Sequence, residues 1–259
     1  MLTINLRNFK KLLMNIPNLL DGYNLYVNKE KFKLIKEAFL TLPQGAKSFA
    51  DLGGVWKVNA AYTFYTLKNH LVNKAYLVDT NFNDIVIEHS KRYNHLNCIK
   101  GNFAEIDTIK KLGYVGVVFF FDVLLHQVEP NWDEVLSRYS SITDCIIIYN
   151  QQYIKSENTL RLTDLPLDEY SEIVPKRNDN LYSFIYSHKK EINKEYNKPW
   201  GNIHNIWQWG ITDSDLRTKL NELGYNEVYF KNYGQFSELT LFENHGFFLL
   251  RITLRGKNI

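Results

Sequence analysis

In the first forty-five residues, apolar side chains recur three and four positions apart, as at Phe32 and Ile35. This spacing predicts amphipathic helices. Pro43 then interrupts the pattern. We therefore expect a helical segment over residues 1–45 and one large domain over residues 46–259.

From residue 46 onward, short apolar runs alternate with stretches of helical spacing. Five runs predict strands: 48–54, 74–81, 96–103, 114–121 and 143–153. Three stretches between them predict helices: 57–72, 82–94 and 129–142. The alternation indicates an α/β fold, in which right-handed crossovers connect the strands of a parallel sheet.

The pattern lapses between about residues 154 and 210, which are polar, aromatic and weakly periodic. An unstructured loop of that length is rare in a compact domain, so we expect an inserted cap of short helices. A helix over 211–225 follows, which Thr212 or Asp213 can cap. Two strands, 226–234 and 245–255, then end the pattern as an antiparallel pair, which brings the sheet to seven strands.

Composition and charge argue against several classes of protein. The chain has 259 residues and a formal net charge of +3, too small an excess for a dedicated nucleic-acid binder. The two cysteines, Cys98 and Cys145, lie in apolar runs and predict buried thiols in a reducing compartment. No signal-peptide pattern and no run of roughly 20 apolar residues is present, so we expect a cytoplasmic protein.

Acids and glycines stand where the predicted strands end. Ligands of parallel sheets bind at the carboxyl ends of strands, which makes these positions candidates for a binding site. The positions are Asp51, Gly53, Gly54, Asp79, Asn102 and Asp122. Taken singly, the glycine pair also fits a plain turn, and Asp79 also fits a helix cap. No spacing of His, Asp or Glu suggests a metal site.

This order of elements and motifs resembles the class I S-adenosylmethionine-dependent methyltransferases. The resemblance implies a Rossmann-like, mostly parallel seven-stranded sheet with an antiparallel last strand and helices on both faces. In that family an acid-x-Gly-x-Gly loop surrounds the methionine end of the cofactor. Asp51 and Gly53 match it, Val55 stands at the second glycine, and Gly54 can supply the flexibility instead.

The resemblance also assigns roles to the other strand ends. Asp79 would bind both ribose hydroxyls, since a carboxylate accepts two hydrogen bonds. Asn102 and Phe103 would contact the adenine, and Asp122 would lie near the methyl group. The cofactor is then S-adenosyl-L-methionine, and the acceptor is a small molecule.

Two histidines are candidates for a general base. His126 follows the fourth strand, and His204 lies among Trp200, Trp207 and Trp209 in the cap. His126 can equally be a structural histidine of the turn. The tryptophans can line an acceptor pocket or anchor the cap, and Trp56 can stack on a ligand or pack against the cap.

The whole chain also resembles methyltransferases of bacterial capsule and surface-polysaccharide clusters. That would make the acceptor a sugar, a sugar nucleotide or a small phosphorylated precursor such as phosphoramidate. One alternative is a degenerate, non-catalytic cofactor-binding subunit. Another is a nicotinamide-dependent oxidoreductase, although Val55 and Val58 replace glycines of the dinucleotide fingerprint.

Overall fold

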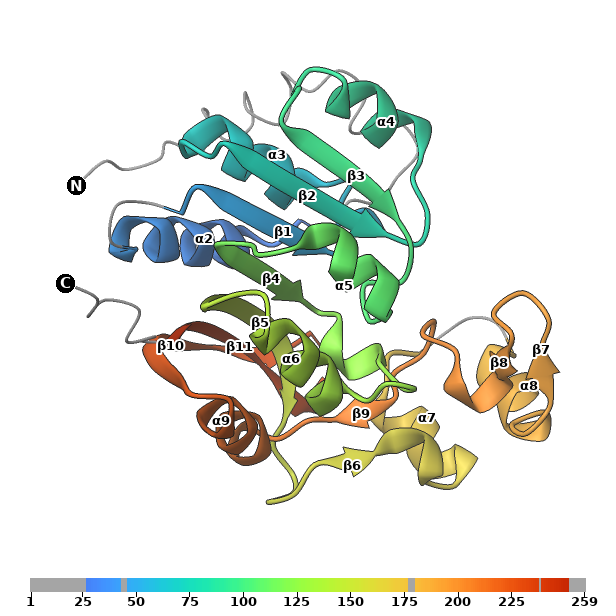
Figure 1. Cartoon of the computed structure of the whole chain (residues 1–259). Helices are drawn as coiled ribbons and strands as arrows, with labels where there is room; N and C mark the ends of the chain where they lie inside the picture. Colours follow the sequence, from blue (N-terminus) through green and yellow to red (C-terminus); the bar gives the residue numbers. More distant parts are fainter. Residues whose placement is uncertain (1–26, 43–45, 177–179, 238, 252–259) are drawn as a thin grey trace.

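The computed structural model describes residues 27–42, 46–176, 180–237 and 239–251. Its main sheet has seven strands in the order β10-β11-β5-β4-β1-β2-β3 (Figure 1). The strands are β1 Ser48–Leu52, β2 Lys74–Asp79, β3 Leu96–Lys100, β4 Val117–Phe121, β5 Cys145–Tyr153, β10 Tyr225–Phe236 and β11 Leu239–Arg251. All pairs among β1–β5 are parallel, and β11 is antiparallel to both of its neighbours. The predicted seven-stranded sheet with an antiparallel last strand is therefore confirmed.

Helices cover both faces of this sheet, as predicted. One layer consists of α2 Lys29–Thr41, α3 Ala61–Asn69 and α4 Asp84–Ser90, and the other of α5 Ile106–Leu112, α6 Trp132–Ser140 and α9 Asp213–Glu222 (Figure 1). Strand β4 is buried at every position, because its side chains point alternately into the two layers. Phe119 and Phe121 join the core cluster on the α2–α3 side, and Phe120 joins the cluster on the other side.

The loop after β1 is longer than predicted. We expected a helix from Lys57, but α3 begins at Ala61. Lys57, Asn59 and Ala60 have φ of 55°, 46° and 57°, which no right-handed helix permits. The amide of Ala60 instead donates to the carbonyl of Gly54 at 2.8 Å. The prediction was therefore wrong for the first turn, and the chain stays close to the end of β1 for several more residues.

The residues between β5 and α9 form short elements, as the weak periodicity predicted. They are β6 Leu160–Arg161, the 3-10 helix η2 Leu162–Asp164, α7 Leu167–Ile173, α8 Leu181–Ser187, β7 Ile192–Asn193, β8 Lys198–Pro199, the 3-10 helix η3 Trp200–Asn202 and β9 Trp209–Gly210. Figure 1 shows α7, α8, β7 and β8 beyond the carboxyl ends of the parallel strands. These elements share an apolar cluster of their own with the ends of β5, β10 and β11. We call this segment the cap.

Two local predictions have different outcomes. Thr212 caps α9, since its hydroxyl accepts from the amide of Asp215 at 3.4 Å, and Gly224 follows the helix with φ of 80°. Cys145 is buried as expected, but Cys98 is exposed because β3 is an edge strand. Within the described ranges, no helix combines the length and the apolar character that crossing a membrane requires.

Candidate functional site

We call the edge at which β1, β2, β4 and β5 end the carboxyl edge. Asp51 lies there on β1 and is buried. Its Oδ2 accepts a hydrogen bond from the Thr63 hydroxyl at 2.6 Å, whereas its Oδ1 has no partner among the residues that the structure describes. Burial raises the pKa of Asp51 to about 6. A buried carboxylate oxygen without a donor is costly, so Asp51 Oδ1 has capacity for a further hydrogen bond.

The two glycines after Asp51 have no room for a side chain. A Cβ on Gly54 would lie 2.6 Å from Asp51 Oδ2 and 2.9 Å from Leu77 Cδ1. A Cβ on Gly53, whose φ is 70°, would lie 2.8 Å from Val123 Cγ1. The amide of Gly53 donates to the carbonyl of Val78 at 2.7 Å and thereby ties the loop to β2. The glycine pair therefore brings backbone close to Asp51 where any other residue would clash.

Asp79 is the last residue of β2 and is largely buried. Its Oδ2 accepts from the amide of Val55 at 2.9 Å, and its Oδ1 accepts from the amide of Asn81 at 3.1 Å. Burial raises the pKa of Asp79, although these amides act in the opposite direction. Each carboxylate oxygen has two lone pairs, so both keep capacity for a ligand hydroxyl.

Val55, which departs from the glycine pattern, has a clear role. Its side chain is buried in the core cluster on the α2–α3 side. Its amide faces the other way, toward the Asp79 carboxylate. A valine is tolerated here because the loop uses only the backbone of this residue.

Asp122 follows β4 with φ of 56°, an uncommon backbone conformation for a residue other than glycine. Its Oδ1 accepts from Gln151 Nε2 at 2.8 Å, and its Oδ2 forms an ion pair with Lys31 of α2. Sequence reasoning missed both partners. One signal was present, because Lys31 shares the helical spacing of the buried residues Leu34 and Ala38.

The three acids lie at the ends of three neighbouring strands, β4, β1 and β2. Lys31 lowers the pKa of Asp51, and Asp79 raises it, in both cases less strongly than burial affects it. The pKa of Tyr62 is raised by burial and also by the charges of Asp122 and Asp51. The structure thus brings together the strand-end acids that the sequence separates by more than seventy positions.

Asn102 and Phe103 lie in the loop after β3. Asn102 Oδ1 accepts from the amide of Ala104 at 2.9 Å and forms a local turn. The Phe103 side chain is buried in the core, and its carbonyl accepts from the Tyr139 hydroxyl at 2.8 Å. Among the described residues, neither side chain is hydrogen-bonded to any of the three acids.

The two candidate bases lie near each other where the cap meets the 3-10 helix η1 Leu124–His126. His126 Nδ1 donates to the carbonyl of Ile206 at 2.7 Å, which makes Nε2 the acceptor nitrogen of the neutral ring. Burial lowers the pKa of His204 to about 4, and the charge of Lys198 acts in the same direction.

The tryptophans of the cap make anchoring contacts. Trp209 Nε1 donates to the carbonyl of Gln127 at 2.6 Å, and Trp207 packs edge-on against Phe242 with ring centroids 4.8 Å apart. Trp56, in contrast, is 67% exposed, with the Lys57 ammonium 4.5 Å from its ring centroid. The prediction that Trp56 packs against the cap is therefore wrong.

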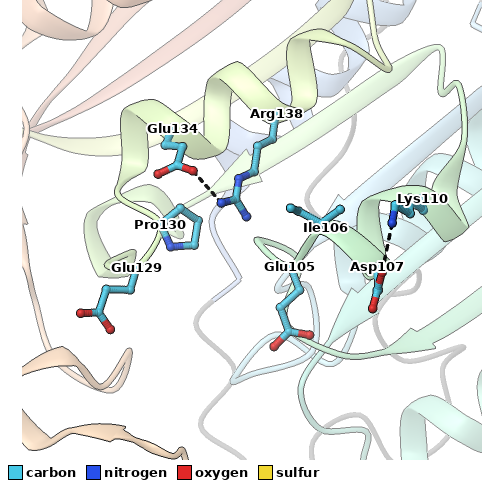
Figure 2. A pocket seen from close by; sticks show the side chains of 8 residues that line it. All are labelled: Glu105, Ile106, Asp107, Lys110, Glu129, Pro130, Glu134 and Arg138. Carbon is cyan, nitrogen blue, oxygen red and sulfur yellow. Dashed lines mark hydrogen bonds and ion pairs between the residues drawn. The ribbon is translucent and has the colours of Figure 1, made fainter.

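A surface hollow of about 660 Å³ lies between the start of α5 and α6 (Figure 2). Its lining residues are Glu105, Ile106, Asp107, Lys110, Glu129, Pro130, Glu134 and Arg138. Arg138 pairs with Glu134, and Lys110 pairs with Asp107 (Figure 2). The hollow includes none of the predicted site residues. Because Arg138 and Lys110 are each paired with an acid of the lining, we propose no ligand for it. Within the described part of the chain, no group of three or more His, Cys, Asp or Glu side chains is placed to hold a metal ion.

Comparison with known proteins gives matches only at the level of structure. No protein-family model matches the sequence, and no curated protein matches it either. The 1,6-didemethyltoxoflavin-N1-methyltransferase of Burkholderia thailandensis, solved with 1,6-didemethyltoxoflavin and S-adenosylhomocysteine, is similar with a TM-score of 0.56 and 10% identity. The match covers 97% of this chain and 92% of that one. The chain has the fold of a class I methyltransferase.

Two further structures support the assignment of the fold. The N-terminal domain of EvdMO1, solved with S-adenosylhomocysteine bound, matches with a TM-score of 0.52 and 10% identity, over 96% of this chain and 97% of that one. The small RNA methyltransferase HEN1 matches with a TM-score of 0.52 and 14% identity, over 87% of this chain and 25% of that one. Neighbours with this fold thus differ widely in what their names say they act on.

Proposed function

We propose that the protein transfers a methyl group from S-adenosylmethionine to a small-molecule acceptor. The observation that carries the proposal is the unpartnered, buried Oδ1 of Asp51 beside Gly54, at the carboxyl edge of a sheet with this strand order. The likeness of the fold to methyltransferases solved with S-adenosylhomocysteine supports it.

The charges of the site suit this cofactor, which has a sulfonium and an ammonium group. Asp122 and Asp51 both interact with the buried Lys31, and Asp79 interacts with Asp51, so acids are in excess. Asp51 Oδ1 would accept from the ammonium, and Asp79 would accept from the ribose hydroxyls. When bound, the cofactor supplies an electrophilic methyl group. The protein then has to orient the acceptor and exclude water, and we assign both tasks to the cap.

His126 is the better candidate for a general base. Because Nδ1–H donates to the carbonyl of Ile206, Nε2 is the ring nitrogen that would accept a proton from an acceptor hydroxyl. The low pKa of His204 makes that side chain a weak base at neutral pH. An amine or anionic acceptor would need neither histidine.

Two observations bear on the class of the acceptor. A neighbour named for a small heterocyclic substrate favours a small molecule, and the net charge of +3 does not favour RNA. Within this class, we propose a sugar, a sugar nucleotide or a small phosphorylated precursor of surface polysaccharide, as expected from the sequence.

Calorimetric titration with S-adenosylmethionine, S-adenosylhomocysteine and NAD tests the proposal. We expect both adenosyl ligands to bind, and Asp79→Ala to weaken them about tenfold to a hundredfold, because hydrogen bonds to a charged group are lost. Asp84→Ala, an exposed acid at the start of α4, is the matched control and should bind as the wild type does. Undiminished affinity in Asp79→Ala would remove the ribose assignment, and binding of NAD alone would identify an oxidoreductase. Binding without turnover on any acceptor mixture would favour a non-catalytic subunit.

A further inference from the structure

Lys31 is a buried cation with a single ion-pair partner among the described residues. Its side chain is 4% exposed, and its ammonium pairs with Asp122, whose side chain is 37% exposed. Burying an ammonium is expensive unless a carboxylate compensates it. Asp122 has a second partner, Gln151, which donates to its other oxygen. The pair is thus fixed on one side and accessible on the side of Asp122.

The surroundings of Lys31 hold its ammonium in place. It lies 5.0 Å from the ring centroid of Tyr149, 5.2 Å from that of Tyr62 and 5.5 Å from that of Phe121. The start of α2 is fixed by Asn28, whose amide donates to the Tyr62 hydroxyl and whose Nδ2 donates to the Tyr149 hydroxyl. Lys31 is therefore enclosed by aromatic rings and cannot itself reach a ligand.

Asp122 adjoins the glycine loop. The next residue, Val123, packs so closely on Gly53 that a Cβ there would lie 2.8 Å from it. Asp51, which precedes the glycine loop, interacts electrostatically with Lys31, so the ammonium of Lys31 is also near this acid. The Lys31–Asp122 pair therefore lies beside the part of the loop that would surround the methionine end of the cofactor.

We propose that Asp122 is the counter-ion of the cofactor's sulfonium and that Lys31 is a positioning residue, which orients this carboxylate and offsets its charge. The inference rests on the proposed function. The Asp122 carboxylate would face a positive charge before methyl transfer and a neutral sulfur afterwards. The bond from sulfur to methyl breaks with both electrons left on sulfur, the acceptor's lone pair forms the new bond, and the acceptor's proton leaves to His126 or to solvent.

This arrangement has a catalytic consequence. An unbalanced carboxylate beside the sulfonium would stabilise the bound substrate more than the transition state, in which the charge on sulfur is already reduced. Such preferential binding of the ground state raises the barrier. Lys31 reduces the field of Asp122 and so limits this effect, while the hydrogen bond from Gln151 keeps the carboxylate oriented.

The test needs no acceptor. Calorimetry gives the dissociation constants of S-adenosylmethionine and S-adenosylhomocysteine, which differ by the methyl group and the positive charge. The ratio of the homocysteine constant to the methionine constant should rise about tenfold in Lys31→Met and fall about tenfold in Asp122→Asn, as for one charge acting over a few ångströms in a partly buried site. In the double variant Lys31→Met/Asp122→Asn it should return to within about twofold of the wild type.

Matched variants separate this role from a structural one. Lys33→Met, on the same helix with its side chain 64% exposed, should leave the ratio unchanged. If Asp122→Asn fails to fold because it leaves a buried ammonium unpaired, Lys31→Met and the double variant still decide the question. Equal ratios in all folded variants, with both ligands bound, would overturn the inference and leave the proposed function standing. Absence of binding of either ligand to the wild type would overturn both.

Discussion

The carboxyl edge has two halves that are built in different ways. One half, at β1 and β2, is where we propose that the cofactor binds, and we call it the cofactor half. Its partners are close in sequence: Asp51 bonds to Thr63, and Asp79 bonds to the amides of Val55 and Asn81. The other half, at β4 and β5, is where we propose that methyl transfer occurs, and we call it the transfer half. Its partners are more distant, and the nearest, Gln151, follows Asp122 by 29 residues. Lys31 precedes Asp122 by 91 residues, and the carbonyl that fixes His126 follows it by 80.

The halves also differ in what they leave available. Asp51 Oδ1 has no partner within the described residues, whereas both oxygens of Asp122 have one. The first half therefore has unused capacity to bind a ligand, and the second is a charge-balanced arrangement already in place. We expect changes in the cofactor half to alter affinity, and changes in the transfer half to alter the discrimination between charged and neutral ligands.

The largest effect is expected for Gly54→Ala in the cofactor half. The new methyl group would lie 2.6 Å from Asp51 Oδ2 and 2.9 Å from Leu77 Cδ1. The loop must shift, so we expect S-adenosylhomocysteine to bind at least about a hundredfold more weakly. Overpacking should also cost about 1–3 kcal/mol of stability. Calorimetry and thermal unfolding measure the two quantities.

Gly113→Ala is the control for this substitution. A Cβ there meets nothing within 4 Å, but the φ of 61° strains any side chain. The φ of 61° and ψ of −156° at Gly113 form a combination that essentially only glycine adopts, so we expect a loss of about 1–3 kcal/mol of stability from the backbone alone and an unchanged affinity. Should Gly54→Ala behave in the same way, the close approach of the loop to Asp51 would have no part in binding.

The contrast between the halves also explains what the sequence could predict. The sheet, its antiparallel last strand and the acids at strand ends follow from apolar runs that end abruptly at Asp51, Asp79 and Asp122. Alternation is a local property, and parallel strands end at one edge whatever their partners are. The positions of the acids in the cofactor half were therefore predictable from the pattern, whereas the roles proposed for them came from the resemblance to a known family.

The transfer half was not, because packing between distant segments decides it. Lys31 shares the helical spacing of the buried residues Leu34 and Ala38, but nothing in the sequence indicated that this face of the helix would meet the end of β4. The late start of α3 depends on the positive φ angles of Lys57 and Asn59, which propensities do not foresee. The exposure of Cys98 likewise depends on strand order, which places β3 at an edge.

A smaller effect is expected for Asp51→Asn, which separates stability from binding. Burial raises the pKa of Asp51 from 3.8 to about 6, so the folded protein binds this proton more tightly than the unfolded chain does. Its stability therefore falls as pH rises from about 4 to about 6 and stays lowered above that range. Asparagine removes this penalty and can still accept from the Thr63 hydroxyl.

We expect Asp51→Asn to be more stable than the wild type by about 2–3 kcal/mol at pH 7 and equally stable near pH 4. Affinity for S-adenosylmethionine should fall about tenfold, because the ammonium loses its carboxylate. Wild-type affinity should also rise with pH through about 6, and that of the variant should not. Denaturant unfolding and calorimetry across this range provide the measurements. A variant that is less stable at every pH would show that ionised Asp51 supports the fold instead of straining it.

The smallest effect is expected for a substitution of His245, which lies beside the transfer half in a cluster of charged residues that pair with one another. His245 of β11 lies between Asp213 and Glu243, with its Nδ1 2.8 Å and its Nε2 3.2 Å from their carboxylate oxygens. Arg217 also pairs with Asp213. Burial acts to lower the pKa of His245, but the hydrogen bonds and charges of the two acids outweigh it, and the pKa is raised above 6.5.

Because this pKa is raised in the folded protein, the protonated His245 contributes stability that is complete below about pH 6.5 and is lost as pH rises through the folded-state value. We expect His245→Gln to cost about 1 kcal/mol at pH 6 and progressively less toward pH 9, as followed by denaturant unfolding. Affinity for S-adenosylhomocysteine should stay within about twofold of the wild type, because the cluster uses its polar groups on one another. A pH-independent cost would reduce His245 to a packing residue. A change in affinity would mean that the transfer half extends across β5 to β11, and that His245 and its two acids take part in ligand binding.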